Sequence, residues 1–145
     1  MSYYPDLSPY EYTPYDIEAG ISSLNIGWLA ASEPYNQGVT SVEFQEKLLQ
    51  FCAKDCVYHC LGYDDCEFCE NHDSVIRVHC DGEEVWLGNG EIRVIGDSAT
   101  YAAPTLIYHY VVAHNYRPPD EFIEAVLTGP LPGSRVHQAL IKKLI

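Results

Sequence analysis

Residues 75–95, which read VIRVHCDGEEVWLGNGEIRVI, contain three short apolar segments separated by two turn dipeptides. The dipeptides are Asp81-Gly82 and Asn89-Gly90, and both suit two-residue hairpin turns because Asp, Asn and Gly tolerate positive φ. In the third segment apolar residues alternate with charged ones, so one face of the sheet is expected to be buried against helices. The pattern predicts a three-stranded antiparallel meander over residues 75–95.

Apolar residues at three- and four-residue spacing predict helices on both sides of the meander. One helix is expected from 40 to about 54, because Thr40 and Glu43 form a capping box and four residues share its inner face: Phe44, Leu48, Phe51 and Cys52. Further helices are expected over 104–113, 120–127 and 134–144, the first opening at Pro104 and the last facing inward through Val136, Leu140 and Leu144. A short strand is expected over 24–29. The sequence thus predicts an α+β fold in which the meander packs against three or four helices.

The chain of 145 residues is the usual size of one domain. Residues 1–16 hold five Tyr and three Pro, and prolines this closely spaced exclude a helix. We therefore expect an extended Tyr/Pro-rich arm over 1–16 and a single globular α+β domain over 17–145. The arm either packs its rings on the domain or serves as an interaction strip, and the sequence does not separate these two roles.

The chain carries a formal net charge of −13, with eight Lys and Arg against 21 Asp and Glu. This charge repels phosphate backbones, so direct nucleic-acid binding is not expected, and it favours a protein partner with a basic surface. No apolar stretch approaches the ~20 residues of a membrane span, and the first residues do not resemble a secretory signal. We expect a soluble cytoplasmic protein with reduced thiols; its oligomeric state is not indicated.

Cys66 and Cys69 form a CxxC pair, in which a tight turn can direct both sulfurs towards one metal ion. Several carboxylates surround the pair, among them Asp65 and Glu67. Neighbouring negative charges disfavour a thiolate unless a cation compensates them, which favours a metal site over a redox-active one. Zinc with a structural role is the predicted metal.

Two ligand sets could complete this site. The first adds His109 and His114, which would tie the loop to a distant helix across the core. Five residues along a helix correspond to about 140° of rotation, so both rings reach one ion only if the helix unwinds before His114. The second set is local and adds His72, His79 or Cys80, an alternative that sequence spacing alone favours.

Several phrases resemble a small family of uncharacterised bacterial proteins over roughly residues 3–130: DLSPYEY (6–12), GNGEIRV (88–94), YAAP (101–104) and HYVVAHNYRPP (109–119). The resemblance implies a single-domain protein, carries no assigned activity, and favours His109 and His114 as ligands. The family pattern Gly-x-His-x-Cys-x-Phe-Cys places Asp64 where its His would stand. Asp64 would then supply an oxygen ligand, leave the site to other residues, or mark a weakened site.

The favoured function is an intracellular acidic interaction domain with a structural zinc, for example an inhibitor or immunity-type protein that covers a basic active site. A zinc-dependent hydrolase is the first alternative, with Cys66, Cys69 and one His as ligands and Glu67 or Glu70 as base. No His-Glu-x-x-His motif supports it, and we assign no catalytic residue. A structural homo-oligomer subunit is the second alternative.

Overall fold

The structure is a computed structural model that describes residues 2–10, 23–58, 61–69 and 75–144. Its elements follow in the order β1 (Ser23–Asn25), α2 (Val42–Lys54), β2 (Ile76–Cys80), β3 (Glu83–Leu87), β4 (Glu91–Ile95), β5 (Thr100–Pro104), α3 (Ile107–Ala113), α4 (Asp120–Thr128) and α5 (Arg135–Leu144). The predicted α+β class is confirmed. None of the described helices is long and apolar enough to cross a membrane.

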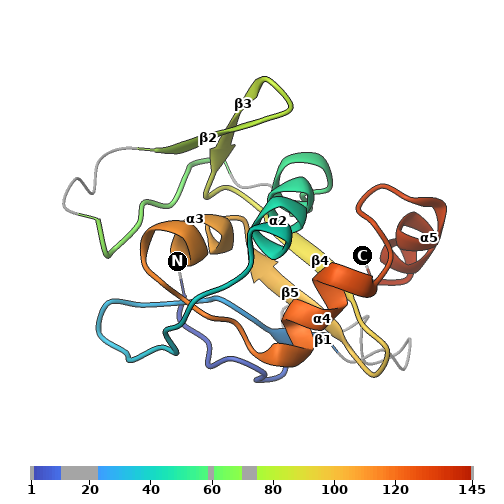
Figure 1. Cartoon of the computed structure of the whole chain (residues 1–145), viewed down its shortest axis with the longest axis horizontal. Helices are drawn as coiled ribbons and strands as arrows, with labels where there is room; N and C mark the ends of the chain where they lie inside the picture. The colour runs from blue at the N-terminus through green and yellow to red at the C-terminus, as the bar shows by residue number, and fades with distance from the viewer. Residues whose placement is uncertain (1, 11–22, 59–60, 70–74, 145) are drawn as a thin grey trace.

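A three-stranded sheet with the order β1-β5-β4 forms the centre of the domain. β5 pairs in parallel with β1 and antiparallel with β4. Every residue of β5 and residues 92–95 of β4 are buried, so these strands are covered on both faces. Helices α2 and α4 lie over β4 on one side of the sheet (Figure 1).

The predicted meander over 75–95 is wrong in its third strand. β2 and β3 form the expected antiparallel hairpin around Asp81-Gly82, and this hairpin projects from the rest of the molecule (Figure 1). β4 instead joins the central sheet. The connection between β3 and β4 bends because Thr105 bonds both of its ends: its amide donates to the Gly90 carbonyl at 3.0 Å, and its hydroxyl accepts the Gly88 amide at 2.8 Å.

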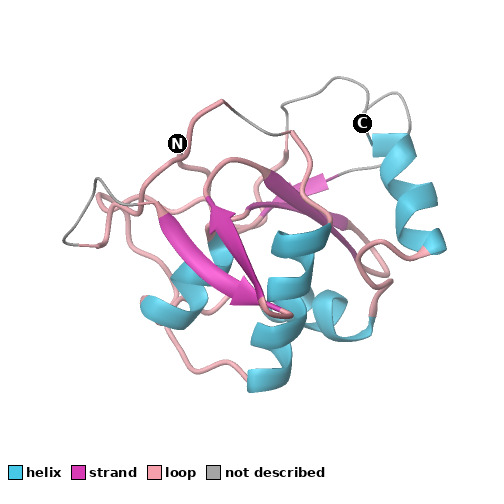
Figure 2. Ribbon diagram, turned by 90° about the horizontal axis from the view of Figure 1, so that it is seen from above, coloured by secondary structure: helices cyan, strands magenta, loops and turns pink. Residues whose placement is uncertain are grey.

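Helix α2 confirms the predicted periodicity, since Phe44, Leu48, Phe51 and Cys52 are all buried. The cap is Ser41 rather than Thr40, because the Ser41 hydroxyl accepts the Phe44 amide at 3.1 Å. Figure 2 shows this helix and the β2–β3 hairpin from above, with the remaining helices on either side.

The helix predicted to open at Pro104 begins later. Pro104 is the last residue of β5, opposite Glu91 of β4, and α3 begins at Ile107. The strand was missed because 100–104 is short and contains two alanines that give no strand-like pattern. Helix α4 begins at Asp120 as predicted and ends at Thr128, with Gly129 as its C-cap.

Helix α5 lies where the sequence places it but presents a different face. Val136 is exposed and Leu140 half-buried, whereas His137 and Ile141 are buried. His137 Nε2 donates to the Arg93 carbonyl at 2.8 Å, and its Nδ1 lies against the Asp55 carboxylate. These polar contacts set the rotation of the helix, which an apolar pattern cannot reveal.

The described part of the N-terminal arm, residues 2–10, runs along β1. Leu7 and Tyr10 donate their amides to the carbonyls of Asn25 and Ser23, at 2.7 and 2.9 Å, and the Asn25 amide donates to the Ser8 carbonyl at 2.8 Å. The arm thereby covers the free edge of β1. Residues 11–22, which include the predicted arm boundary, lie outside the described residues.

Arg93 is a charged residue inside the domain, with 1% of its side chain exposed. Its guanidinium lies 2.9 Å from the Glu91 carboxylate and stacks on the ring of Tyr10, 4.5 Å from the ring centroid. A buried charge is tolerated when it is paired and hydrogen-bonded in this way.

Replacing Arg93 by Ala is expected to lower the free energy of unfolding by about 3–5 kcal/mol, because Glu91 would be left without its buried partner. Arg117→Ala is the control. Its exposed pair with Asp120, at 2.7 Å, should contribute about 1 kcal/mol or less. Urea denaturation of both variants measures the difference, and equal losses would contradict the assigned role of Arg93.

Candidate metal centre

Cys66 and Cys69 lie at the two ends of a turn. The Cys69 amide donates to the Cys66 carbonyl at 3.3 Å, which brings the two side chains to the same side of the loop. Phe68 fixes the turn on the domain, since its ring lies edge-on to Tyr35 and Tyr110, with centroids 5.2 and 5.8 Å apart. Cys66 is 1% exposed, so the turn enters the core at that residue.

Gly88, at the end of β3, holds the start of this loop. Its carbonyl accepts the Asp64 amide at 2.9 Å. Gly88 has φ +110°, and a Cβ atom there would lie 2.5 Å from the Asp64 carbonyl oxygen. Only glycine permits both this conformation and this approach, so the loop can dock on the β3–β4 connection.

His109 and His114 come from α3 and its C-terminal cap. The helix ends at Ala113, and His114 leaves helical geometry with φ −123° and ψ 17°. Asn115 follows with φ +57°, which turns the chain away. The unwinding that the sequence requires is therefore present, and it turns the His114 ring towards His109, with centroids 4.9 Å apart.

The four side chains direct one donor atom each to a common point. His109 Nε2 lies 3.2 Å from Cys69 Sγ, and His114 Nε2 lies 3.3 Å from Cys66 Sγ and 3.4 Å from Cys69 Sγ. The two Nε2 atoms are 3.2 Å apart. All four donor atoms lie within 4.8 Å of one another, and the group could hold a metal ion.

Hydrogen bonding alone does not account for this arrangement. His114 Nε2 has three neighbours at 3.2–3.4 Å, yet one ring nitrogen offers either a single proton or a single lone pair. Four donor atoms around one point are instead the arrangement that a central cation stabilises. The geometry therefore favours a metal ion over a network of thiols and imidazoles.

Burial shifts both kinds of ligand towards their neutral forms. Burial and the neighbouring charge of His114 lower the pKa of His109 to about 4, and burial lowers the pKa of His114. Burial raises the pKa of the Cys66 thiol to about 11. Neutral imidazoles present their lone pairs at pH 7, whereas the thiol needs a cation before it gives up its proton.

The group of four contains none of the alternative ligands among the described residues. Asp64 is engaged through its backbone with Gly88, and His79 is exposed on β2. Cys80 accepts a hydrogen bond from Gln50 Nε2 at 3.3 Å. His72 lies outside the described residues. No disulfide joins any two of the five described cysteines.

Sequence reasoning missed the two supports of the site. Gly88 stands just before the predicted Asn89-Gly90 turn, and nothing in the sequence indicates that it admits the Asp64 backbone. Glu67 was considered as a catalytic base, but its carboxylate accepts the Ala31 amide at 3.2 Å and so helps to hold the loop. Neither contact leaves a signal in local sequence.

Residues 2–127 match the model of a family described as a domain of unknown function, DUF7919. No match was found among curated proteins or among solved structures.

Gly88→Ala is expected to weaken divalent-metal binding at least about tenfold, because the new Cβ must push the Asp64 backbone and its loop away. Gly82→Ala is the matched control. Gly82 also has positive φ, +83°, but a Cβ there meets nothing within 4 Å. Competition with a chromophoric chelator measures both affinities, and equal weakening would show that backbone strain alone is responsible.

Proposed function

The chain belongs to the DUF7919 family, and we propose that its domain is organised around a structural zinc ion bound by Cys66, Cys69, His109 and His114. The observation that carries this proposal is the convergence of the four donor atoms. A tetrahedral zinc site with bonds of about 2.3 Å to sulfur and 2.0–2.1 Å to nitrogen has edges of about 3.6 Å between S and N and about 3.3 Å between two N. Three of the S–N distances and the N–N distance, at 3.2–3.4 Å, are close to those edges.

The donor set favours a structural ion over a catalytic one. A catalytic zinc keeps a position open for water, whereas four protein ligands close the tetrahedron. The carboxylate of Glu67, one of the two candidate bases, is bonded to the Ala31 amide, and Glu70 lies outside the described residues. The ion would join the 61–69 loop to the C-terminal end of α3, two segments that are about 40 residues apart in sequence.

Purified protein is expected to contain one zinc ion per chain by elemental analysis. Cobalt substitution should give the intense visible absorption of tetrahedral coordination and a sulfur-to-metal charge-transfer band. Cys69→Ser and His114→Ala should each lose the stoichiometric ion, and Cys56→Ser and His79→Ala should retain it. Retention of the ion in His114→Ala together with its loss in His79→Ala would reject the assignment and favour a local ligand set.

Chelation is expected to lower the midpoint of thermal unfolding, because an ion that binds only the folded state stabilises it in proportion to its binding free energy. Cys56→Ser and His79→Ala, the two variants expected to retain the ion, serve as controls. If chelation removes the ion without changing the unfolding midpoint, the ion is bound but does not stabilise the fold.

The second part of this proposal is that the domain binds a protein with a basic surface, and features of the β2–β3 hairpin support it. Trp86 and Tyr63 are 43% and 40% exposed, and their ring centroids lie 5.6 Å apart. The hairpin also carries the exposed acids Asp81, Glu83 and Glu84. Exposed aromatic rings bordered by acids are suited to binding a basic partner, such as the active site that an inhibitor or immunity-type protein covers.

Trp86→Ala is expected to abolish capture of such a partner from an extract at low salt, and Val39→Ala, at an even more exposed apolar residue elsewhere, should not. Captured proteins would be identified by mass spectrometry, and raising the salt concentration should release them. Capture that is unchanged by Trp86→Ala, or partners without a basic surface, would contradict this part of the proposal.

A further inference from the structure

A cleft of about 650 Å³ lies between the N-terminal arm and the sheet. Four aromatic residues line it: Tyr4, Tyr10, Trp28 and Tyr58. Tyr4 and Trp28 stand perpendicular, at 86°, with ring centroids 5.6 Å apart. The volume is within the range of small-molecule sites, and the cleft does not include any residue of the candidate metal centre.

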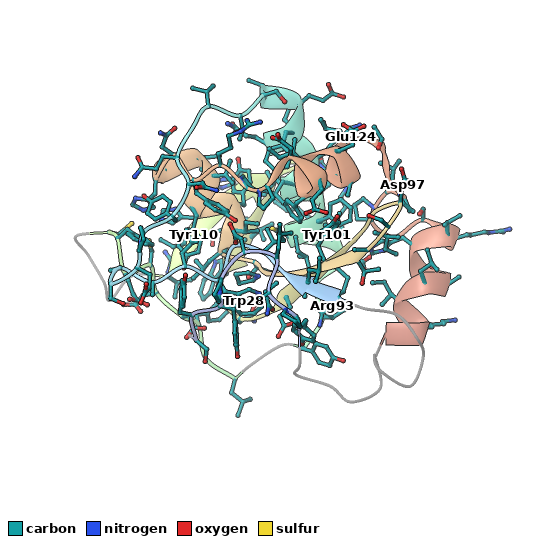
Figure 3. All side chains as sticks on the ribbon, turned by 90° about the horizontal axis from the view of Figure 1, so that it is seen from below. Trp28, Arg93, Asp97, Tyr101, Tyr110 and Glu124 are labelled. Carbon is teal, nitrogen blue, oxygen red and sulfur yellow. The ribbon has the colours of Figure 1, made fainter. Side chains whose placement is uncertain are left out.

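Trp28 and Arg93 both lie on the side of the sheet that carries the arm (Figure 3). The guanidinium of Arg93 is an example of a cation that stacks on the tyrosine rings of this cleft. The guanidinium carbon lies 4.5 Å from the centroid of Tyr10 and 5.3 Å from that of Tyr58. The charge of Arg93 is compensated by Glu91 at 2.9 Å, so the buried guanidinium does not leave the cleft positive.

Several hydrogen-bond donors of the cleft wall are already used. Trp28 Nε1 donates to the Ala102 carbonyl at 3.0 Å, and the Tyr10 hydroxyl donates to Glu91 at 2.9 Å. The Ser8 hydroxyl donates to the Pro5 carbonyl at 2.6 Å. In contrast, the amide oxygen of buried Asn25 accepts no hydrogen bond from the residues that the structure describes. The cleft wall therefore suits a ligand that carries its own hydrogen-bond donors.

The charge of the surroundings favours a cationic ligand. A smaller hollow of about 60 Å³ shares Trp28, Tyr58 and Glu91 with the cleft and adds Asp64. Among the described residues, neither hollow is lined by Lys or Arg. The chain as a whole carries −13. Aromatic faces near the carboxylate of Asp64, in a negative field, attract an organic cation through the ring quadrupole and through charge.

We propose that this cleft binds an alkylguanidinium or alkylammonium group. The group packs its apolar stem against Trp28 and Tyr4 and directs its N–H donors towards the Asn25 amide oxygen and towards Glu91 Oε2, since Glu91 Oε1 is the oxygen that accepts from Tyr10 and Arg93. The cation is supplied either by an arginine or lysine side chain of a partner protein or by a free organic amine, and the chemistry recognised is the same.

Isothermal titration with N-acetyl-arginine amide tests the proposal on the full-length, metal-loaded protein. A ligand of this size is expected to bind with a dissociation constant of about 1 mM or below. N-acetyl-citrulline amide has nearly the same shape without the charge, and it should bind at least about tenfold more weakly. Equal binding of the two compounds, or binding of neither, would overturn the proposal.

Tyr4→Ala locates the site, and Tyr3→Ala is its matched control. The two tyrosines are neighbours with 39% and 37% exposure, but only Tyr4 lines the cleft. Tyr4→Ala should weaken binding of the arginine compound about two- to fivefold, the loss expected for one exposed cation–π contact. Tyr3→Ala should leave it unchanged, and equal effects of both would place the binding elsewhere.

Two further ligands distinguish the sources of the cation. Agmatine is a free alkylguanidinium, and Gly-Arg-Gly presents the same group on a peptide. Tighter binding of the peptide by about tenfold or more indicates a protein side chain, and tighter binding of agmatine indicates a free amine. Either order supports the cleft as a cation site, whereas failure of both to bind would reject it.

Discussion

Two sulfur atoms from a loop and two ring nitrogens from the end of α3 lie within 4.8 Å of one another, and the position of the 61–69 segment depends on this convergence. The segment contains no helix or strand of its own. It is held by the backbone contact with Gly88, by the rings around Phe68 and by the four donor atoms. A cation among these donors would offset the cost of bringing two thiols and two imidazoles out of water.

A different polar interaction lies at β4 of the central sheet. Arg93 is buried between Glu91 and the ring of Tyr10, while its backbone carbonyl accepts the proton of His137 from α5. One strand residue therefore contacts the N-terminal arm through its side chain and the C-terminal helix through its main chain. The N-terminal arm also forms one wall of the cleft. The buried charge of Arg93 and the proposed cation site therefore lie in the same part of the structure.

Features that depend only on residues close together in the sequence were predictable. The β2–β3 hairpin follows from Asp81-Gly82, and the inner face of α2 follows from its apolar spacing. The CxxC pair follows from its spacing, but His109 and His114 were preferred over the local set only through the family resemblance, and the structure brings them together with the pair. Predictions failed where two distant segments compete: β4 pairs with β5 instead of β3, and α5 turns His137 inward instead of Val136.

By itself the sequence determined the α+β class, the hairpin, the approximate extent of the long helices and the residue types that can bind a metal. These properties depend on neighbours within a few positions, through turn φ values, side-chain periodicity and capping. Only the tertiary structure decided which strands pair, which face of α5 is buried, and which histidines reach the CxxC sulfurs. Each of these depends on contacts between residues far apart in the chain, whose free energy has no counterpart in local sequence.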